Sequence, residues 1–595
     1  MSDPITYERE WTLMFYFASD NPLAPGIVSQ LKALKNAGYH HGASVIAYFD
    51  PETRGTPTHT FDVNGVAKIL NPRNLPGYRP NDPYVRNLMY DKLWGDELTR
   101  NRETKIRESL MNELGIAPAS FVLPKPPNYP GNELPVVAAA GQTGQKKDQD
   151  HKGHHGPEDS LKTFLSFCAE HYKANHYMLF ILGHGGVVGN DVFLYDKHAE
   201  TPSLKLRTLG KVLREFKEKI GNSSFELLSL HSCSMSSLEV AFELHDTANY
   251  MLASQGPAFV GSWPYTQILI RIFNDIEALT NAGAPESAAD ARATLIETMI
   301  EKIFKYVLYN STDYMLAGYS FDLSLCDLRK INNGLIEKAI KDWATALKES
   351  LADSMVMNLI LLAHWKAQSY WGDYYTDLYD FCFCLRKYLE QLGDATGDKE
   401  KYKVLIGHCT EVMGLLAKRS SKYPNNAIQQ AEFAGPEAQY SHGFSVFFPW
   451  SAPSADKTIS SEYQGDKKDA GYRFNATGWY DFLKQYWGAF PGDGTQRAVR
   501  KEETDSVAAT QRAPSKREEL LEDMASLMFN DRGPLNTPGA LDDDPPVKPR
   551  PTDPTGDECT CGSVKNYPHD TRPLRERVHS AFEDAPPFSP GFLSL

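Results

Sequence analysis

A cysteine and a histidine of this chain each follow a short apolar run and could together carry out nucleophilic catalysis. Cys233 comes just after the run at 225–230, and His184 comes just after the run at 176–182. If the two runs are neighbouring parallel strands, the thiol and the imidazole share one rim of a sheet. A free thiol is only a few per cent thiolate at neutral pH, so the histidine would act as its base.

Further segments form an ordered series along the chain. They are 11–21, 184–186, 239–244, 252–255, 261–265, 320–323, 377–380, 442–449 and 479–482. Together with Cys233, this series resembles the clostripain family of cysteine peptidases, which have a caspase-like fold. The likeness covers roughly residues 8–488, with a gap at about 65–157. The resemblance implies a cysteine endopeptidase that acts on protein substrates through a dyad of Cys233 and His184.

The glycines after His184 leave their backbone N–H groups unhindered. The amides of Gly185 and Cys233 are therefore the expected donors to the oxyanion of the tetrahedral intermediate. Losing one such donor typically costs on the order of 100- to 1000-fold in rate. The sequence names no third catalytic residue, and a backbone carbonyl could orient the imidazole.

Four positions are expected to bind substrate by the same resemblance. They are His231, Ser254, Trp263 and Pro264. The family usually has Asp at the position of His231, and an acid is common at the position of Pro264. Because those carboxylates would pair with Arg or Lys at P1, a strong preference for basic P1 residues is not expected. His231 either donates a hydrogen bond to a neutral or acidic P1 residue or packs beneath the strand.

Activation by cutting the chain between the two catalytic residues is a further implication of the resemblance. Residues 195–207 are predicted to form an exposed polar loop before a helix at 209–220. The candidate cleavage sites, in order of preference, are Lys197, Lys205 and Arg207. Since a basic P1 preference is not expected, both self-cleavage and cleavage by a separate activating protease are considered.

Alternating apolar segments predict a doubly wound, mostly parallel α/β sheet flanked by helices. The expected strands are 11–18, 43–49, 176–182, 225–230, 250–254 and a late one at 443–449. A helical subdomain is expected at about 285–417, with helices at 288–308, 332–351 and 379–392. Residues 1–490 would thus form one peptidase domain, with a Pro- and Gly-rich insertion at about 65–157.

The tail, residues 491–595, is rich in Pro, Asp and Gly and is predicted to be mostly disordered. One part differs, because 515–518 has a capping-box pattern and the apolar residues that follow lie on one helical face. Those residues are Leu520, Leu521, Met524, Leu527 and Met528. A free helix of this length is marginal, so it should dock on the catalytic domain or on another protein, such as an activating protease or a regulator.

Composition limits the partners and the compartment. The chain has 595 residues and a net charge of −14, which argues against nucleic-acid and anionic-membrane binding. The longest apolar stretch, 355–363, is too short to span a bilayer, and the first residues show no secretory signal. Eight cysteines in a chain this long do not form a disulfide framework, so a cytoplasmic protein is expected.

No cofactor is expected, and calcium is possible by family analogy alone. A metal site is not predicted, because neither candidate cluster has a partner pair at zinc-site spacing. The two clusters are His151, His154 and His155, and Cys559 with Cys561. The alternative function is a catalytically silent caspase-like module that acts as a protein-interaction scaffold, and labelling by a thiol-directed probe would separate the two.

Overall fold

The computed structural model describes residues 7–62 in part and residues 156–489 with short gaps. Almost all of the predicted insertion and the whole of the tail lie outside the described residues. So do both candidate metal clusters and the predicted tail helix.

An eight-stranded sheet forms the centre of the described part, with strand order β10-β7-β6-β5-β4-β1-β2-β3. The strands are β1 (Tyr7–Phe17), β2 (Ala43–Phe49), β3 (His59–Asp62), β4 (Tyr172–Leu182), β5 (Phe225–His231), β6 (Ala248–Ala253), β7 (Phe321–Asp327) and β10 (Ile428–Ala434). The five strands from β2 to β6 in the sheet are parallel, whereas β3, β7 and β10 pair antiparallel. This confirms the predicted α/β fold with a mostly parallel sheet.

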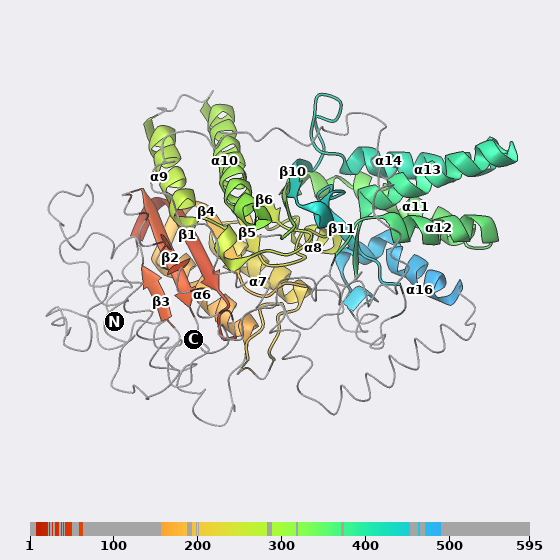
Figure 1. Cartoon of the computed structure of the whole chain (residues 1–595). Coiled ribbons are helices and arrows are strands. Elements are labelled where there is room, and N and C mark those ends of the chain that lie inside the picture. Colours follow the sequence, from red (N-terminus) through yellow and green to blue (C-terminus); the bar gives the residue numbers. More distant parts are fainter. Residues whose placement is uncertain are drawn as a thin grey trace, which may run out of the picture.

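Helices cover both faces of the sheet (Figure 1). One face carries α6 (Pro157–His171), α7 (Leu206–Lys219) and α8 (Leu238–Leu244), and the other carries α9 (Tyr265–Asn281) and α10 (Ala288–Leu316). Side chains along β4 point alternately to the two faces of the sheet, so the hydrophobic core has two parts. Leu179 and Ile181 pack with the first set of helices, whereas Met178 and Phe180 pack with the second. The strands are buried on both faces, as expected for a parallel sheet.

A helical subdomain extends from one end of the sheet (Figure 1). Its helices are α11 (Leu335–Ser350), α12 (Ser354–Lys366), α13 (Leu378–Thr396), α14 (Lys399–Leu416) and α16 (Trp479–Ala489). A small sheet, β11-β9-β8, joins it through β8 (Ser369–Tyr370), β9 (Tyr375–Asp377) and β11 (Ser445–Phe447). Trp343 of α11 stacks on Trp479 of α16, with ring centroids 5.5 Å apart. The chain therefore returns after β11 to complete this subdomain.

The subdomain differs from the expected 285–417. Helix α10 packs on the large sheet, and β7 pairs with β6 inside it. The segment up to Asp327 therefore belongs to the large sheet and its covering helices. Helices α12 and α14 were not predicted from the sequence. The late strand is shorter than expected and pairs with β9, outside the large sheet. These features depend on pairing between segments far apart in the chain, which local patterns do not reveal.

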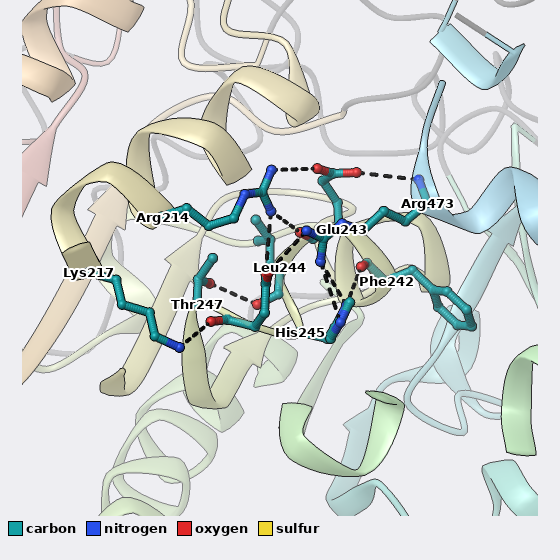
Figure 2. A network of polar contacts seen from close by, with 9 residues as sticks. Arg214, Lys217, Phe242, Glu243, Leu244, His245, Thr247 and Arg473 are labelled. Carbon is teal, nitrogen blue, oxygen red and sulfur yellow. Dashed lines mark hydrogen bonds and ion pairs between the residues drawn. The ribbon is translucent and has the colours of Figure 1, made fainter. Parts of the chain in front are cut away.

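A network of charged residues ties α7 to α8 and to η5 (Arg473–Thr477), as Figure 2 shows. Arg214 of α7 pairs with Glu243 at 3.1 Å and with Asp246 at 3.3 Å. Arg473 pairs with Asp246 from the other side at 2.9 Å. Burial opposes ionisation of Asp246, but the hydrogen bond and charge of Arg473, with Arg214, lower the pKa of that carboxyl. Helix α7 is therefore fixed to a segment more than 200 residues later in the chain.

Candidate active site

Cys233 and His184 follow two strands that lie side by side. Strands β4 and β5 are parallel neighbours, and their register aligns Leu182 with His231. The Gly183 N–H donates to the His231 carbonyl over 3.5 Å, which extends the pairing beyond the strand end. The two residues thus leave the sheet at adjoining positions of the same rim.

Gly185 lies directly against the backbone of Cys233. A Cβ atom at position 185 would be 1.8 Å from the Cys233 carbonyl oxygen and 2.5 Å from its nitrogen. No side chain fits in that space, so the close approach requires glycine. The two amides expected to hold the oxyanion therefore belong to backbone segments in direct contact.

The chain turns sharply after Cys233. Ser234 has a φ of 57°, in the left-handed region that non-glycine residues rarely adopt. Its N–H donates to the Gly256 carbonyl over 3.0 Å, which holds the turn. Such strained positions cost on the order of 1–3 kcal/mol and cluster at functional sites.

The Cys233 thiol is enclosed. Its residue is 2 % exposed, and the Ala258 N–H donates to Sγ over 3.4 Å. Burial raises the pKa of the thiol to about 11, although the Ala258 contact opposes the shift. The thiol is therefore protonated at neutral pH in this state.

The His184 imidazole is buried without a polar partner. The residue is 0 % exposed, and neither Nδ1 nor Nε2 has a hydrogen-bond partner among the described residues. Burial lowers the pKa of His184 to about 3, so the ring is neutral. A buried polar group with no partner is costly and needs an explanation, such as a reacting partner that arrives later. The carbonyl that could have oriented this ring is not among its contacts in the described part.

His231 packs beneath the strand, the second of its two expected arrangements. Its Nε2–H donates to the Phe259 carbonyl over 2.6 Å, so the neutral ring accepts at Nδ1 from the Tyr265 hydroxyl, 3.0 Å away. The ring stacks on Trp263 with centroids 4.4 Å apart. Burial lowers the pKa of His231 to about 3. Because both nitrogens are engaged, no donor remains for a substrate side chain.

The other three expected substrate positions differ in exposure. Ser254 is buried at the end of β6, where its carbonyl accepts from the Ser236 N–H over 2.8 Å. Trp263 is also buried, whereas Pro264 is half-buried. Of the four, Pro264 alone is partly open to solvent.

Asp322 of β7 is a site residue to which the sequence assigned no role. Its carboxylate accepts the Gln255 N–H over 2.6 Å and the Gly256 N–H over 2.7 Å. It thereby holds the turn that supplies the Ala258 amide to Cys233. Burial raises the pKa of Asp322 to about 7, while the two amides oppose that shift. An acid followed by a mostly apolar run was the available sequence signal.

A second buried acid, Asp377, joins three of the matched segments. It accepts from the Gln255 side-chain amide over 2.9 Å and from the His442 N–H over 2.6 Å. Gln255 in turn accepts the Gly443 N–H over 2.8 Å. The segments at 252–255, 377–380 and 442–449 therefore meet at one polar cluster behind the rim.

The candidate cleavage segment lies close to His184. The Leu194 N–H donates to the His184 carbonyl over 3.0 Å, and the Lys197 N–H donates to the Asp20 carbonyl over 2.8 Å. Lys197 itself is exposed. Lys205 is exposed just before α7, whereas Arg207 lies inside α7 and is half-buried. The helix begins at Leu206, three residues earlier than predicted, so Arg207 is not in the loop.

Within the described ranges no group of three or more His, Cys, Asp or Glu side chains could hold a metal ion. In the same ranges no helix is long and apolar enough to cross a bilayer.

Comparison with known proteins assigns the chain to a family. Residues 130–486, more than half of the chain, match the clostripain family. Clostripain from Hathewaya histolytica is 22% identical over an alignment of 489 residues, and the match covers 77% of each chain. A secreted C11 cysteine protease from Bacteroides thetaiotaomicron, solved with an irreversible peptide inhibitor, is 14% identical with a TM-score of 0.40; the match covers 80% of this chain and 99% of that one. An inactive zymogen C11 protease from Parabacteroides distasonis is 13% identical with a TM-score of 0.39, over 80% and 99%. The family match shows that this chain belongs to the clostripain family of cysteine peptidases.

Proposed function

We propose that the chain is an endopeptidase in which Cys233 is the nucleophile and His184 the general base and acid. The observation that carries this proposal is the imidazole with no hydrogen-bond partner among the described residues, at the end of the strand next to the one that Cys233 follows. The Gly185 and Cys233 amides would hold the oxyanion, since their backbones are in contact.

The reaction follows from these roles. His184 takes the thiol proton as Cys233 Sγ bonds to the scissile carbonyl carbon, and the negative charge moves to the carbonyl oxygen between the two amides. The C–N bond then breaks, and the protonated imidazole gives its proton to the leaving amine. A water molecule, deprotonated by His184, hydrolyses the thioester and restores the thiol.

We infer that the uncut chain is a closed, resting form. The inference is supported by the burial of both residues and by pKa values that disfavour a thiolate–imidazolium pair. The segment from Leu194 to Lys197 is hydrogen-bonded to the backbone of His184 and of Asp20, so it would restrain the rim of the sheet that carries the two catalytic residues.

Cutting after Lys197 is the proposed activation step. This lysine is exposed, and a cut there divides a loop whose two arms are joined by the hydrogen bond from the Leu204 N–H to the Phe193 carbonyl, while β4 and β5 stay paired. Lys205 is the next candidate. Arg207 is disfavoured, since a protease would have to unwind the first turn of α7. Self-cleavage and cleavage by another protease both satisfy this geometry.

A thiol-directed peptidyl acyloxymethyl ketone tests the proposal. We expect labelling of the cut protein at Cys233, and no labelling or hydrolysis after Cys233→Ala. Cys326→Ala is the matched control, because that thiol is also buried in the sheet region. Hydrolysis that survives Cys233→Ala would overturn the nucleophile assignment. A correctly cut protein whose Cys233 stays unlabelled would support the interaction-scaffold alternative.

A cytoplasmic location is proposed as well. It is supported by the cysteines of the described part, all six of which are buried thiols in no disulfide there. Fractionation of cells that express the full chain would test it, and recovery from the medium would contradict it.

A further inference from the structure

Helix α12 carries apolar side chains on both of its faces. Val356, Ile360 and Ala363 point into the core of the helical subdomain. The opposite side nevertheless bears Met355, Leu362 and Trp365, which form one stripe along the helix, with Leu359 at its edge packed partly against the core. The solvent-facing side of a helix is usually polar, so this stripe is more exposed than its composition predicts.

The stripe is open to solvent in the described part of the molecule. Met355 is 49 % exposed, Leu362 36 % and Trp365 57 %, while Leu359 is half-buried. Among the described residues, three of the eight exposed large apolar side chains thus come from a single helix of 13 residues. Isolated exposed apolar residues are ordinary, but a contiguous group marks an interaction site.

The C-terminal tail leaves the described part of the molecule next to α12, from a helix that packs on the buried side of α12. Helix α16 ends at Ala489, and the hydroxyl of Tyr486 in its last turn lies 2.9 Å from Nδ1 of His364 on α12. Figure 1 shows α16 alongside α12 at the same edge of the subdomain. The segment with the predicted amphipathic pattern starts at Ser515, so residues 490–514 form a connection of 25 residues.

The length of this connection favours docking within one chain. A flexible linker of 25 residues spans about 25–30 Å on average, and a helix of 13 residues is about 20 Å long. The linker can therefore reach any point on α12. It would hold the segment near the stripe at an effective concentration on the order of millimolar, above that of a free partner.

The two surfaces also match in pattern. The apolar residues of the tail segment recur over nine positions, from Leu520 to Met528, and those of α12 recur over eleven, from Met355 to Trp365. A free helix of about 14 residues is marginal in water, so the segment needs an apolar surface to become ordered. The stripe on α12 is an exposed apolar surface, and the tail segment requires such a surface to become helical.

We propose that residues 515–528 dock as an amphipathic helix on the exposed stripe of α12 in the same chain. The tail is then an element of the helical subdomain. This proposal is independent of the catalytic assignments.

Cross-linking tests the contact directly. The full-length protein would carry Leu362→Cys and Met524→Cys, with Cys559→Ser and Cys561→Ser to remove the other tail thiols. The control pairs Met524→Cys with Val404→Cys, which is exposed on α14. With a short bismaleimide we expect an internal cross-link at least about tenfold faster than in the control. Equal rates would overturn the proposal, and so would cross-links that form only between chains and vanish on dilution, since a second copy would then be the occupant.

Hydrogen exchange gives an independent measurement. In the full chain, Leu520→Ser with Met524→Ser and Leu527→Ser should release the segment. Amides of residues 354–366 should then exchange about tenfold faster, the factor that corresponds to ~1.4 kcal/mol. Glu522→Ser, on the polar face of the same predicted helix, should leave the exchange unchanged. Identical exchange in all three proteins would refute docking.

Discussion

At the scale of single residues, the contact between Gly185 and Cys233 is the tightest constraint on the site. Two backbone segments from different strands meet there with no space for a β-carbon. The oxyanion donors depend on this contact, because any displacement of one segment moves one amide away from the other. The site therefore has no space for a side chain at position 185.

Gly185→Ala should remove most of the activity. The new methyl group would overlap the Cys233 carbonyl, and the displaced amide would cost on the order of 100-fold or more in kcat/KM. Gly407→Ala is the matched control, because a Cβ there meets nothing within 4 Å and lies in a helix. It should retain full activity and stability. Peptide hydrolysis and thermal unfolding of both variants check this, and an active Gly185→Ala enzyme would exclude the oxyanion role.

The enclosed thiol has a second consequence at this scale. With the pKa of Cys233 raised to about 11 by burial, about one thiol in ten thousand is ionised at pH 7. Alkylation of Cys233 by iodoacetamide in the uncut chain should therefore be slow. Its rate should rise about tenfold per pH unit up to about pH 10, because the thiolate fraction does so. Mass spectrometry of the modified peptide measures this, and a rate that levels off near pH 7 would contradict the closed state.

At the scale of elements, α7 connects the candidate cleavage segment to the rest of the fold. The ion pairs in Figure 2 fix it to α8 and η5, while its apolar face packs on the sheet. A cut before the helix therefore leaves two fragments held by a full set of contacts. The parts of the enzyme should remain together after activation.

Arg214→Met should destabilise this connection. The substitution leaves the nearly buried carboxylate of Glu243 without its guanidinium partner, which costs about 3 kcal/mol when one member of a buried pair is removed. Lys211→Met on the same helix removes an exposed charge and should change stability by less than about 0.5 kcal/mol. Urea unfolding compares the two, and equal effects would show that the network contributes no more than a surface pair.

At the scale of the whole molecule, the described fold closes without the tail. The large sheet is covered on both faces, and α16 completes the helical subdomain at Ala489.

Deletion of residues 491–595 should therefore leave a protein that unfolds cooperatively. Loss of the docked segment exposes the α12 stripe again, so the melting temperature should fall by a few degrees, about 2–4 °C per kcal/mol in a domain of this size. Calorimetry of the full and shortened proteins measures both effects. Loss of a cooperative transition would show that the tail belongs to the core.

The sequence by itself determined the class of the fold and the two residues offered for catalysis. Buried parallel strands are apolar along their whole length, and a nucleophile or base at a strand end directly follows such a run. Strands and catalytic candidates can therefore both be predicted from short stretches of sequence. Cys233 and His184 stand out for that reason, and so does the ordered series of family segments. The roles of Lys197 and Lys205 remain predictions.

Tertiary structure alone decided what surrounds the site. Whether His231 faces a substrate or the core depends on Phe259, Trp263 and Tyr265, which reach it from another part of the chain. The role of Asp322 depends on β7 lying beside β6, a pairing between strands some seventy residues apart. Burial raises the pKa of Cys233 and lowers that of His184. Both shifts depend on tertiary packing, because desolvation requires atoms from many segments of the chain.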